Sequence, residues 1–155
     1  MRACDDFEKN LTTPAPKLAA DGFHLHPWVW LAAASLWDTG HYRAEVQAAA
    51  TSVDVHLQAL VGRRDVTGTG LAREALGAEA PVPSKPRLQV PGDRNAKSWK
   101  SRQAGLRDFA AGCFEAVRNP ATHELEELEK AEALEQLAAL SLLARWLNGC
   151  ELETA

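Results

Sequence analysis

The segment from residue 46 to residue 61 carries the feature that most restricts how this chain can fold. Its apolar residues recur at intervals of three or four positions: Val46, Ala49, Ala50, Val53, Leu57, Leu60 and Val61. That spacing follows the turn of an α-helix and places these side chains on one face. The segment therefore predicts a long amphipathic helix that ends near Gly62, because glycine is a common helix stop.

Other segments show helical periodicity or helix boundaries. A helix is predicted from Pro27 through Trp37, closed by Asp38-Thr39-Gly40. A short helix is predicted at about residues 71–76, introduced by Thr69 and stopped by Gly77. A third main helix is predicted at about residues 98–117, and a fourth from Pro120 or Glu124 to Asn148. Runs of β-branched residues and alternating patterns are lacking. The fold class is therefore predicted to be all-α, an up-and-down bundle of four main helices plus a short helix.

The length of 155 residues suits one domain with a hydrophobic core. Residues 1–22 mix charges, threonine, alanine and two prolines without periodicity, and we interpret them as a flexible leader before a helical domain at 23–150. Residues 77–97 contain four prolines, which break helices and exclude a central strand. This stretch is predicted to be a long surface loop.

Charge and cysteine content restrict the location and the partners of the chain. The net charge of −4 excludes a basic nucleic-acid coat, and the longest stretch without Asp, Glu, Lys or Arg, residues 22–37, is too short to span a membrane. The acidic N-terminus does not resemble a signal peptide, so a cytoplasmic protein is expected. Three widely spaced cysteines suggest neither a disulfide framework nor a zinc ribbon.

Metal binding is not predicted from the histidines. His24 and His26 lie two residues apart, and no Asp, Glu, His or Cys follows at a useful spacing. A buried or capping role is favoured for them, and no metal or cofactor is expected.

The junction Arg118-Asn119-Pro120-Ala121-Thr122-His123 carries the candidate chemistry. Proline disfavours the helical conformation at Asn119, so the third helix is predicted to stop there and Asn119 to cap a new helix. Arg118 would then end one helix while His123 opens the next. A guanidinium and an imidazole held at one junction can bind a phosphate and transfer a proton near neutral pH.

An arginine, four intervening residues and a histidine, with a polar residue directly after the arginine, resemble the RX4-6H signature of the HEPN superfamily. The segments 26–42, 112–124 and 133–147 together resemble the Ymh-type branch of HEPN proteins, over roughly residues 24–150. The resemblance implies a homodimer in which two such motifs form one composite RNA-cleaving site. Arg118 would contact the phosphate, Asn119 would assist and His123 would act as acid and base.

This resemblance implies a metal-independent endoribonuclease that promotes attack of a ribose 2′-hydroxyl on the adjacent phosphodiester. It also implies a role as a toxin or effector in prokaryotic defence or phage conflict, with an antitoxin or defence-complex protein as a further partner. The alternative is a non-catalytic helical module that binds RNA or protein in a defence or toxin–antitoxin complex.

Positive charge is concentrated before the motif. Seven basic residues and one acid lie between positions 85 and 107, and we expect Lys97, Lys100, Arg102 and Arg107 to contact RNA, with a solvated surface as the equal alternative. Six glutamates between residues 124 and 135 oppose RNA binding, although interaction with the dipole at a helix N-terminus is the favoured explanation for most of them. Of these, Glu124 and Glu127 could raise the pKa of His123.

The position on a helix also suggests roles for two other groups of residues. Tyr42, Glu45, Ser52 and His56 form a polar stripe that could meet the Arg118–His123 pair, although a solvated stripe is favoured. Among the tryptophans, Trp30, Trp37 and Trp146 are predicted in the core, whereas Trp28 and Trp99 are predicted at an exposed surface or a dimer contact.

Overall fold

The computed structural model describes residues 24–123 and 125–155; the leader predicted at 1–22 lies outside them. The described chain is mainly helical, as predicted, with one two-stranded sheet. α2 (Pro27–Trp37) and α3 (Tyr42–Val61) are close to the predicted first two helices. α3 ends at Gly62, which adopts the left-handed conformation (φ 66°) that closes many helices.

The region after α3 differs from the prediction. α4 (Gly68–Ala75) begins three residues before the predicted start at residue 71, and Thr67 rather than Thr69 precedes it. The predicted surface loop at 77–97 contains a buried strand, β1 (Arg87–Gln89), which pairs antiparallel with β2 (Glu151–Glu153). Each strand of a two-stranded sheet is an edge strand, so prolines on either side of β1 do not prevent pairing.

The buried amide of Gln103 secures β1 to the third main helix. Its Nε2 donates to the carbonyl oxygens of Leu76 and Leu88, both at 3.0 Å, and its Oε1 accepts from the backbone N–H of Val90 at 2.9 Å. One polar side chain thus satisfies three backbone groups in a buried region. This long-range interaction explains why local composition did not reveal the strand.

The predicted helix break at Pro120 is wrong. α5 (Lys97–Cys113) continues through a π-helical segment, η1 (Phe114–Arg118), into α6 (Asn119–His123), and Asn119 has helical angles (φ −65°, ψ −48°). The N–H of Asn119 bonds to the carbonyl of Phe114, five residues back. This wider turn gives the chain a helical path to Pro120, whose ring and missing N–H conflict with regular α-helical bonding.

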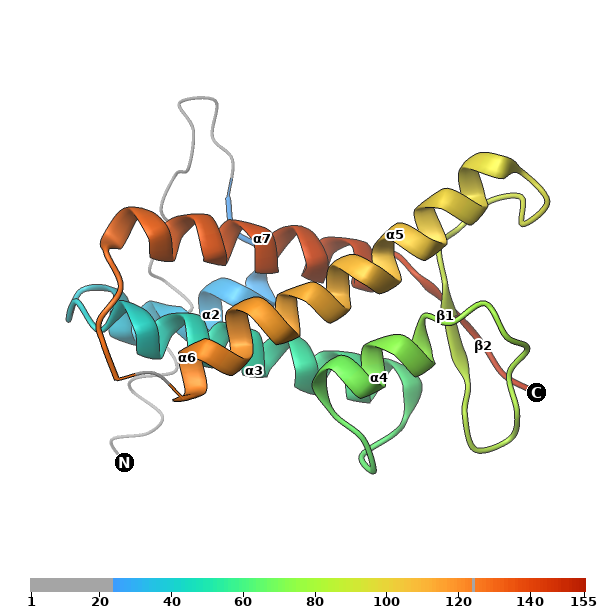
Figure 1. The fold of residues 1–155 in the computed structure, drawn as a ribbon, viewed down its shortest axis with the longest axis horizontal. Helices are drawn as coiled ribbons and strands as arrows, with labels where there is room; N and C mark the ends of the chain where they lie inside the picture. The colour runs from blue at the N-terminus through green and yellow to red at the C-terminus, as the bar shows by residue number, and fades with distance from the viewer. Residues whose placement is uncertain (1–23, 124) are drawn as a thin grey trace.

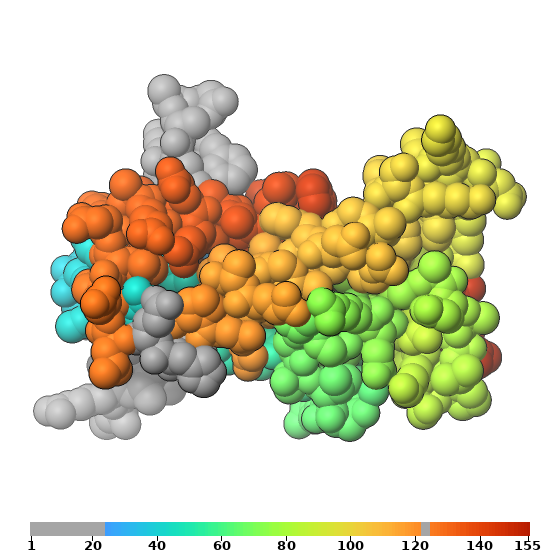
Figure 2. Space-filling view, viewed as in Figure 1, coloured from blue at the N-terminus to red at the C-terminus, as the bar shows by residue number. Residues whose placement is uncertain are grey.

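The last helix, α7 (Lys130–Asn148), begins later than Pro120 or Glu124 and ends at Gly149 as predicted. Figure 1 shows α7 along one long edge of the molecule, with α5, η1 and α6 crossing the view in front of α3. In the space-filling view, the same α5-to-α6 segment forms a diagonal band between α7 and α4 (Figure 2).

The core is built around α3, which packs against α2, α7 and η1. Its fully buried large side chains include Val46, Leu57, Leu71, Phe114, Leu137, Leu140 and Leu147. The apolar stripe predicted for α3 thus forms one wall of this core. Among the described helices, none is long and apolar enough to cross a membrane.

Candidate functional site

Arg118 is the last residue of η1 and lies against the start of α4. Its Nη2 is 3.5 Å from Oδ2 of Asp54 on α3, and Oδ1 of the same carboxylate accepts the backbone N–H of Gly68 at 2.8 Å. Asp54 is buried, with a side chain 5% exposed, whereas the Arg118 side chain is 28% exposed. A buried carboxylate thus orients a partly accessible guanidinium.

Glycine is required at position 68 for two reasons. Its φ is +58°, in the left-handed region that residues with a Cβ rarely adopt. In addition, a Cβ at this position would lie 3.3 Å from Nη1 of Arg118. The backbone at the start of α4 therefore gives Arg118 and Asp54 room to approach each other.

Asn119 and His123 follow on the same helix. Asn119 is exposed, and the backbone of His123 forms the last residue of α6; the His123 side chain lies outside the described part of the structure. At the 3.6 residues per turn of an α-helix, positions 118 and 123 are roughly 140° apart around the axis. The continuous helix therefore does not bring these two positions together in the way that a break at Pro120 would have done.

A buried carboxylic acid lies at the other end of α3. Glu45 is fully buried, and neither of its side-chain oxygens has a hydrogen-bond partner among the described residues. Burial, followed by the negative charges of Glu127 and Asp38, raises the pKa of Glu45 to about 8, against a smaller opposing effect of Lys130. Glu45 is therefore mainly protonated and neutral at pH 7.

The segment between α6 and α7 is fastened to the start of α3. Oε1 of Glu127 accepts the backbone N–H groups of Arg43 at 2.7 Å and Leu128 at 3.0 Å, and Nε of Arg43 donates to the carbonyl of Glu126. These backbone hydrogen bonds lower the pKa of Glu127. Its effect on the pKa of His123 stays a prediction, and Glu124 lies outside the described residues.

The predicted polar stripe of α3 divides into separate environments. Glu45 is buried, Tyr42 packs edge-on against Trp37, and His56 stacks on Trp28 with ring centres 4.3 Å apart. The Nδ1 of His56 lies 2.7 Å from the carbonyl oxygen of Ser52. Sequence reasoning missed Asp54, whose only signal was its position four residues after Ala50 and three before Leu57, which places an acid on the apolar face of the helix.

His26 has the predicted capping role at the start of α2. The imidazole Nδ1 of His26 accepts the backbone N–H of Trp28 at 3.2 Å, and the backbone N–H of His26 donates to Oγ of Ser141 on α7. Burial, then the charges of Arg145 and His56, lowers the pKa of His26. His24 is exposed, and no group of three or more His, Cys, Asp or Glu residues in the described chain could hold a metal ion.

The tryptophan assignments were correct only in part. Trp30 is buried as predicted, but Trp146 is 45% exposed instead of lying in the core. Trp99 is buried, and its indole N–H donates to the carbonyl of Val90 at 2.7 Å. It is therefore used to hold the segment after β1 and does not form the predicted exposed contact.

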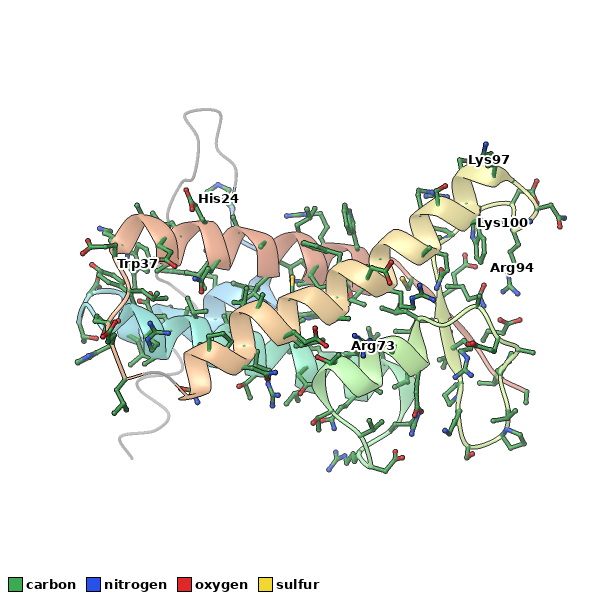
Figure 3. All side chains as sticks on the ribbon, viewed as in Figure 1. His24, Trp37, Arg73, Arg94, Lys97 and Lys100 are labelled. Atoms are coloured by element: carbon green, nitrogen blue, oxygen red, sulfur yellow. The ribbon has the colours of Figure 1, made fainter. Side chains whose placement is uncertain are left out.

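The residues expected to contact RNA follow one another along α5, and all of them are distant from Arg118. Figure 3 shows Arg94, Lys97 and Lys100 at the end of α5 that is far from α6. A helical rise of about 1.5 Å per residue separates Lys100 from Arg118 by roughly 27 Å and Arg107 from Arg118 by roughly 16 Å along the axis. The basic stretch does not border Arg118, so one ligand would have to extend along α5 to contact both.

Several of these cations also have local partners. The Nη2 of Arg102 donates to the carbonyl of Pro91 at 2.9 Å, and Nε of Arg107 pairs with Asp108 at 3.0 Å. Arg94 pairs with Glu153 at 2.7 Å. Lys97 and Lys100 are exposed and form no ion pair with a described carboxylate.

The sequence profile of a protein family with the description "Protein of unknown function (Hypoth_ymh)" matches residues 23–147. No curated protein and no solved structure matches the chain. The profile covers most of the chain and confirms the Ymh-type part of the resemblance, whereas the wider resemblance to HEPN proteins stays a prediction.

Proposed function

Because the chain belongs to the Hypoth_ymh family of proteins of unknown function, we propose its activity from its own residues. We propose a metal-independent endoribonuclease of the HEPN type. In it, Arg118 contacts the scissile phosphate and His123 transfers protons. This proposal joins the spacing of the two residues to the surroundings of Arg118.

The observation that carries the proposal is the support given to Arg118. Its guanidinium is oriented by the buried Asp54, which is itself fixed by the backbone of Gly68, and it keeps about a quarter of its surface accessible. π-helical segments occur frequently at functional sites, and η1 ends at this residue. An oriented, partly exposed arginine is suited to bind the oxygens of a phosphate.

The reaction requires one phosphodiester and its neighbouring 2′-hydroxyl. The hydroxyl loses its proton to a neutral imidazole, the 2′-oxygen forms a bond to phosphorus, and the bond from phosphorus to the 5′-oxygen breaks. The leaving oxygen takes a proton from a protonated imidazole, which gives a 2′,3′-cyclic phosphate and a 5′-hydroxyl. Arg118 stabilises the extra negative charge on the phosphate oxygens in the transition state.

The continuous helix supports the proposal of a composite site. Positions 118 and 123 face different directions around one helix, so a site that needs both residues can take each of them from a different copy. Two copies also supply two imidazoles, one to accept and one to donate a proton. Asn119, exposed between these positions, is assigned to assist binding of the substrate.

A specific observation favours the alternative of a non-catalytic helical module. The Asp54 carboxylate offsets part of the positive charge of Arg118, which weakens its attraction for a phosphate. In that case, Arg118 and Asp54 would serve mainly to join α3, η1 and α4. The chain would then bind RNA or a protein partner in a defence or toxin–antitoxin complex without cutting RNA.

The test is RNA cleavage by the purified full chain, with EDTA present throughout. We expect Arg118→Ala and His123→Ala each to slow cleavage by about 100-fold or more. Arg64→Ala and His24→Ala are matched controls, because both residues are exposed and lie outside the site. Equal cleavage by the wild type and both site variants, or no cleavage by any of them, would reject the ribonuclease proposal.

Expression in a bacterial host tests the proposed role as a toxin. An active ribonuclease that cuts cellular RNA should slow growth, and His123→Ala should relieve this effect. A non-catalytic module should be tolerated in both forms. Equal toxicity of the wild type and of His123→Ala would argue against a role for RNA cleavage in toxicity.

A further inference from the structure

The outward face of α7 carries a regular stripe, which we call the α7 stripe. Its members are spaced alternately by four and three residues, the spacing of a coiled-coil seam. They are Ala131, Glu135, Ala138, Leu142, Arg145 and Gly149. The buried residues of α7 lie on the opposite side, so the core does not account for this second periodic face.

The stripe and its flank expose two large apolar side chains. Leu142 is 39% exposed, and the adjacent Trp146 is 45% exposed. Trp146 also lines a groove of about 530 Å³ together with Leu106 and Phe109 of α5 and Arg102. Tryptophan and arginine are enriched among the residues that contribute most to binding at protein interfaces. The stripe and the groove therefore form one continuous candidate interface.

The charges of the stripe select the partner. Glu135 lies toward the start of α7 and Arg145 toward its end, and neither forms an ion pair with any residue in the described ranges. Glu135 and Arg145 lie the same number of residues before and after position 140. A second α7 running in the opposite direction across this midpoint would place each Glu135 beside the Arg145 of the other copy.

The same register aligns the rest of the stripe. Leu142 meets Ala138 of the other copy, and Gly149 meets Ala131. The pairs are therefore an acid with a base, a large apolar residue with a small one, and two small residues. Such pairs allow the helix axes to approach to the roughly 8–10 Å typical of packed helices. A two-fold axis requires such self-complementarity of a surface.

We infer that a second copy of this chain binds the α7 stripe antiparallel, through a two-fold axis near position 140. This interface goes beyond the proposed ribonuclease activity and uses a different face from Arg118. Where the pairing at the composite site also forms, with its two-fold axis perpendicular to this one, the assembly contains four copies. Loss of the α7 interface then leaves dimers that still contain the composite site.

Molar mass in solution, measured by light scattering during size-exclusion chromatography, tests this inference on the full chain. Arg145→Glu places two glutamates in contact, and Glu135→Arg places two arginines in contact, so each variant should halve the mass of the wild-type assembly. The double variant E135R/R145E restores opposite charges across the axis and should restore the mass. Glu132→Arg is a matched control beside the stripe, expected to leave the mass unchanged.

Several results would overturn the inference. A monomeric wild type, equal masses for all variants, or a double variant that stays as small as the single variants would each exclude this interface. Retained mass in the single variants together with loss of binding to a single-stranded RNA oligonucleotide would assign the surface to RNA. Circular dichroism of each variant separates loss of the interface from loss of the fold. RNA cleavage is measured separately, so failure of the interface is distinguishable from failure of the proposed activity.

Discussion

Replacement of Asp54 tests whether the carboxylate has the structural role assigned to it. Its Oδ1 accepts the buried N–H of Gly68, and its Oδ2 pairs with Arg118. Asp54→Ala removes both interactions, whereas Asp54→Asn keeps an oxygen that can accept the N–H but removes the negative charge. The two variants therefore separate the hydrogen bond from the ion pair.

The expected losses follow from these contacts. A buried N–H without an acceptor costs about 1–3 kcal/mol. Loss of the ion pair adds about 1 kcal/mol, because Arg118 is partly solvated and the contact is 3.5 Å long. Asp54→Ala should therefore lower the free energy of unfolding by about 3 kcal/mol, and Asp54→Asn, which loses only the ion pair, by about 1 kcal/mol.

Urea denaturation measures both differences, and thermal denaturation provides a check. For a chain of this length, about 3 kcal/mol corresponds to a decrease in Tm of about 9 °C. Asp108→Asn is the control, because Asp108 is 70% exposed and its ion pair with Arg107 lies at the surface. If both Asp54 variants unfold within about 0.5 kcal/mol of the wild type, the assigned role is incorrect.

Three further predictions concern the buried acid, two glycines and a thiol. Glu45→Gln removes a carboxyl group whose pKa rises from its usual 4.5 to about 8 on folding. The free energy of unfolding of the wild type should therefore fall relative to that of the variant as pH rises from 4.5 to 8, by at most about 1.4 kcal/mol per pH unit. Urea denaturation across this pH range measures the difference. Gly62→Ala should cost about 1 kcal/mol because φ is positive, whereas Gly112→Ala, with open space at the Cβ and a helical backbone, should stabilise by about 0.5–1 kcal/mol. Burial raises the pKa of Cys113 to about 11, so this thiol should react with a disulfide reagent at pH 8 only after denaturation, as mass spectrometry would show.

Each of these predictions can fail on its own. Parallel stability curves for the wild type and Glu45→Gln would show that Glu45 is not protonated in the fold. Equal effects of the two glycine substitutions would contradict the role of backbone conformation. Rapid labelling of Cys113 in the native protein would contradict its burial.

The helices were predictable because their signals are local. The apolar spacing of α3 and the glycine after it identified that helix closely, and the same reasoning located α2 and the end of α7. β1 was missed because its partner follows more than sixty residues later and a buried glutamine holds it in place. Local composition near its prolines indicated only a loop.

The assignment of Arg118 and His123 to a site stays a prediction from their spacing, but the local backbone expected for them was wrong. The rule that proline ends a helix failed because a π-helical segment precedes Pro120. Asp54 could not be assigned to Arg118, since the contact depends on how α3, η1 and α4 pack. Such packing depends on residues distant in the sequence.

The most direct test of the proposed chemistry compares two oligonucleotides that differ in one atom. One is RNA throughout, and the other has a 2′-deoxyribose on the 5′ side of the bond at which the first is proposed to be cut. The proposal predicts that the RNA yields a 2′,3′-cyclic phosphate and a 5′-hydroxyl, while the substituted bond stays intact. Cleavage of both at the same bond would mean that the 2′-hydroxyl is not the nucleophile, and would contradict the mechanism.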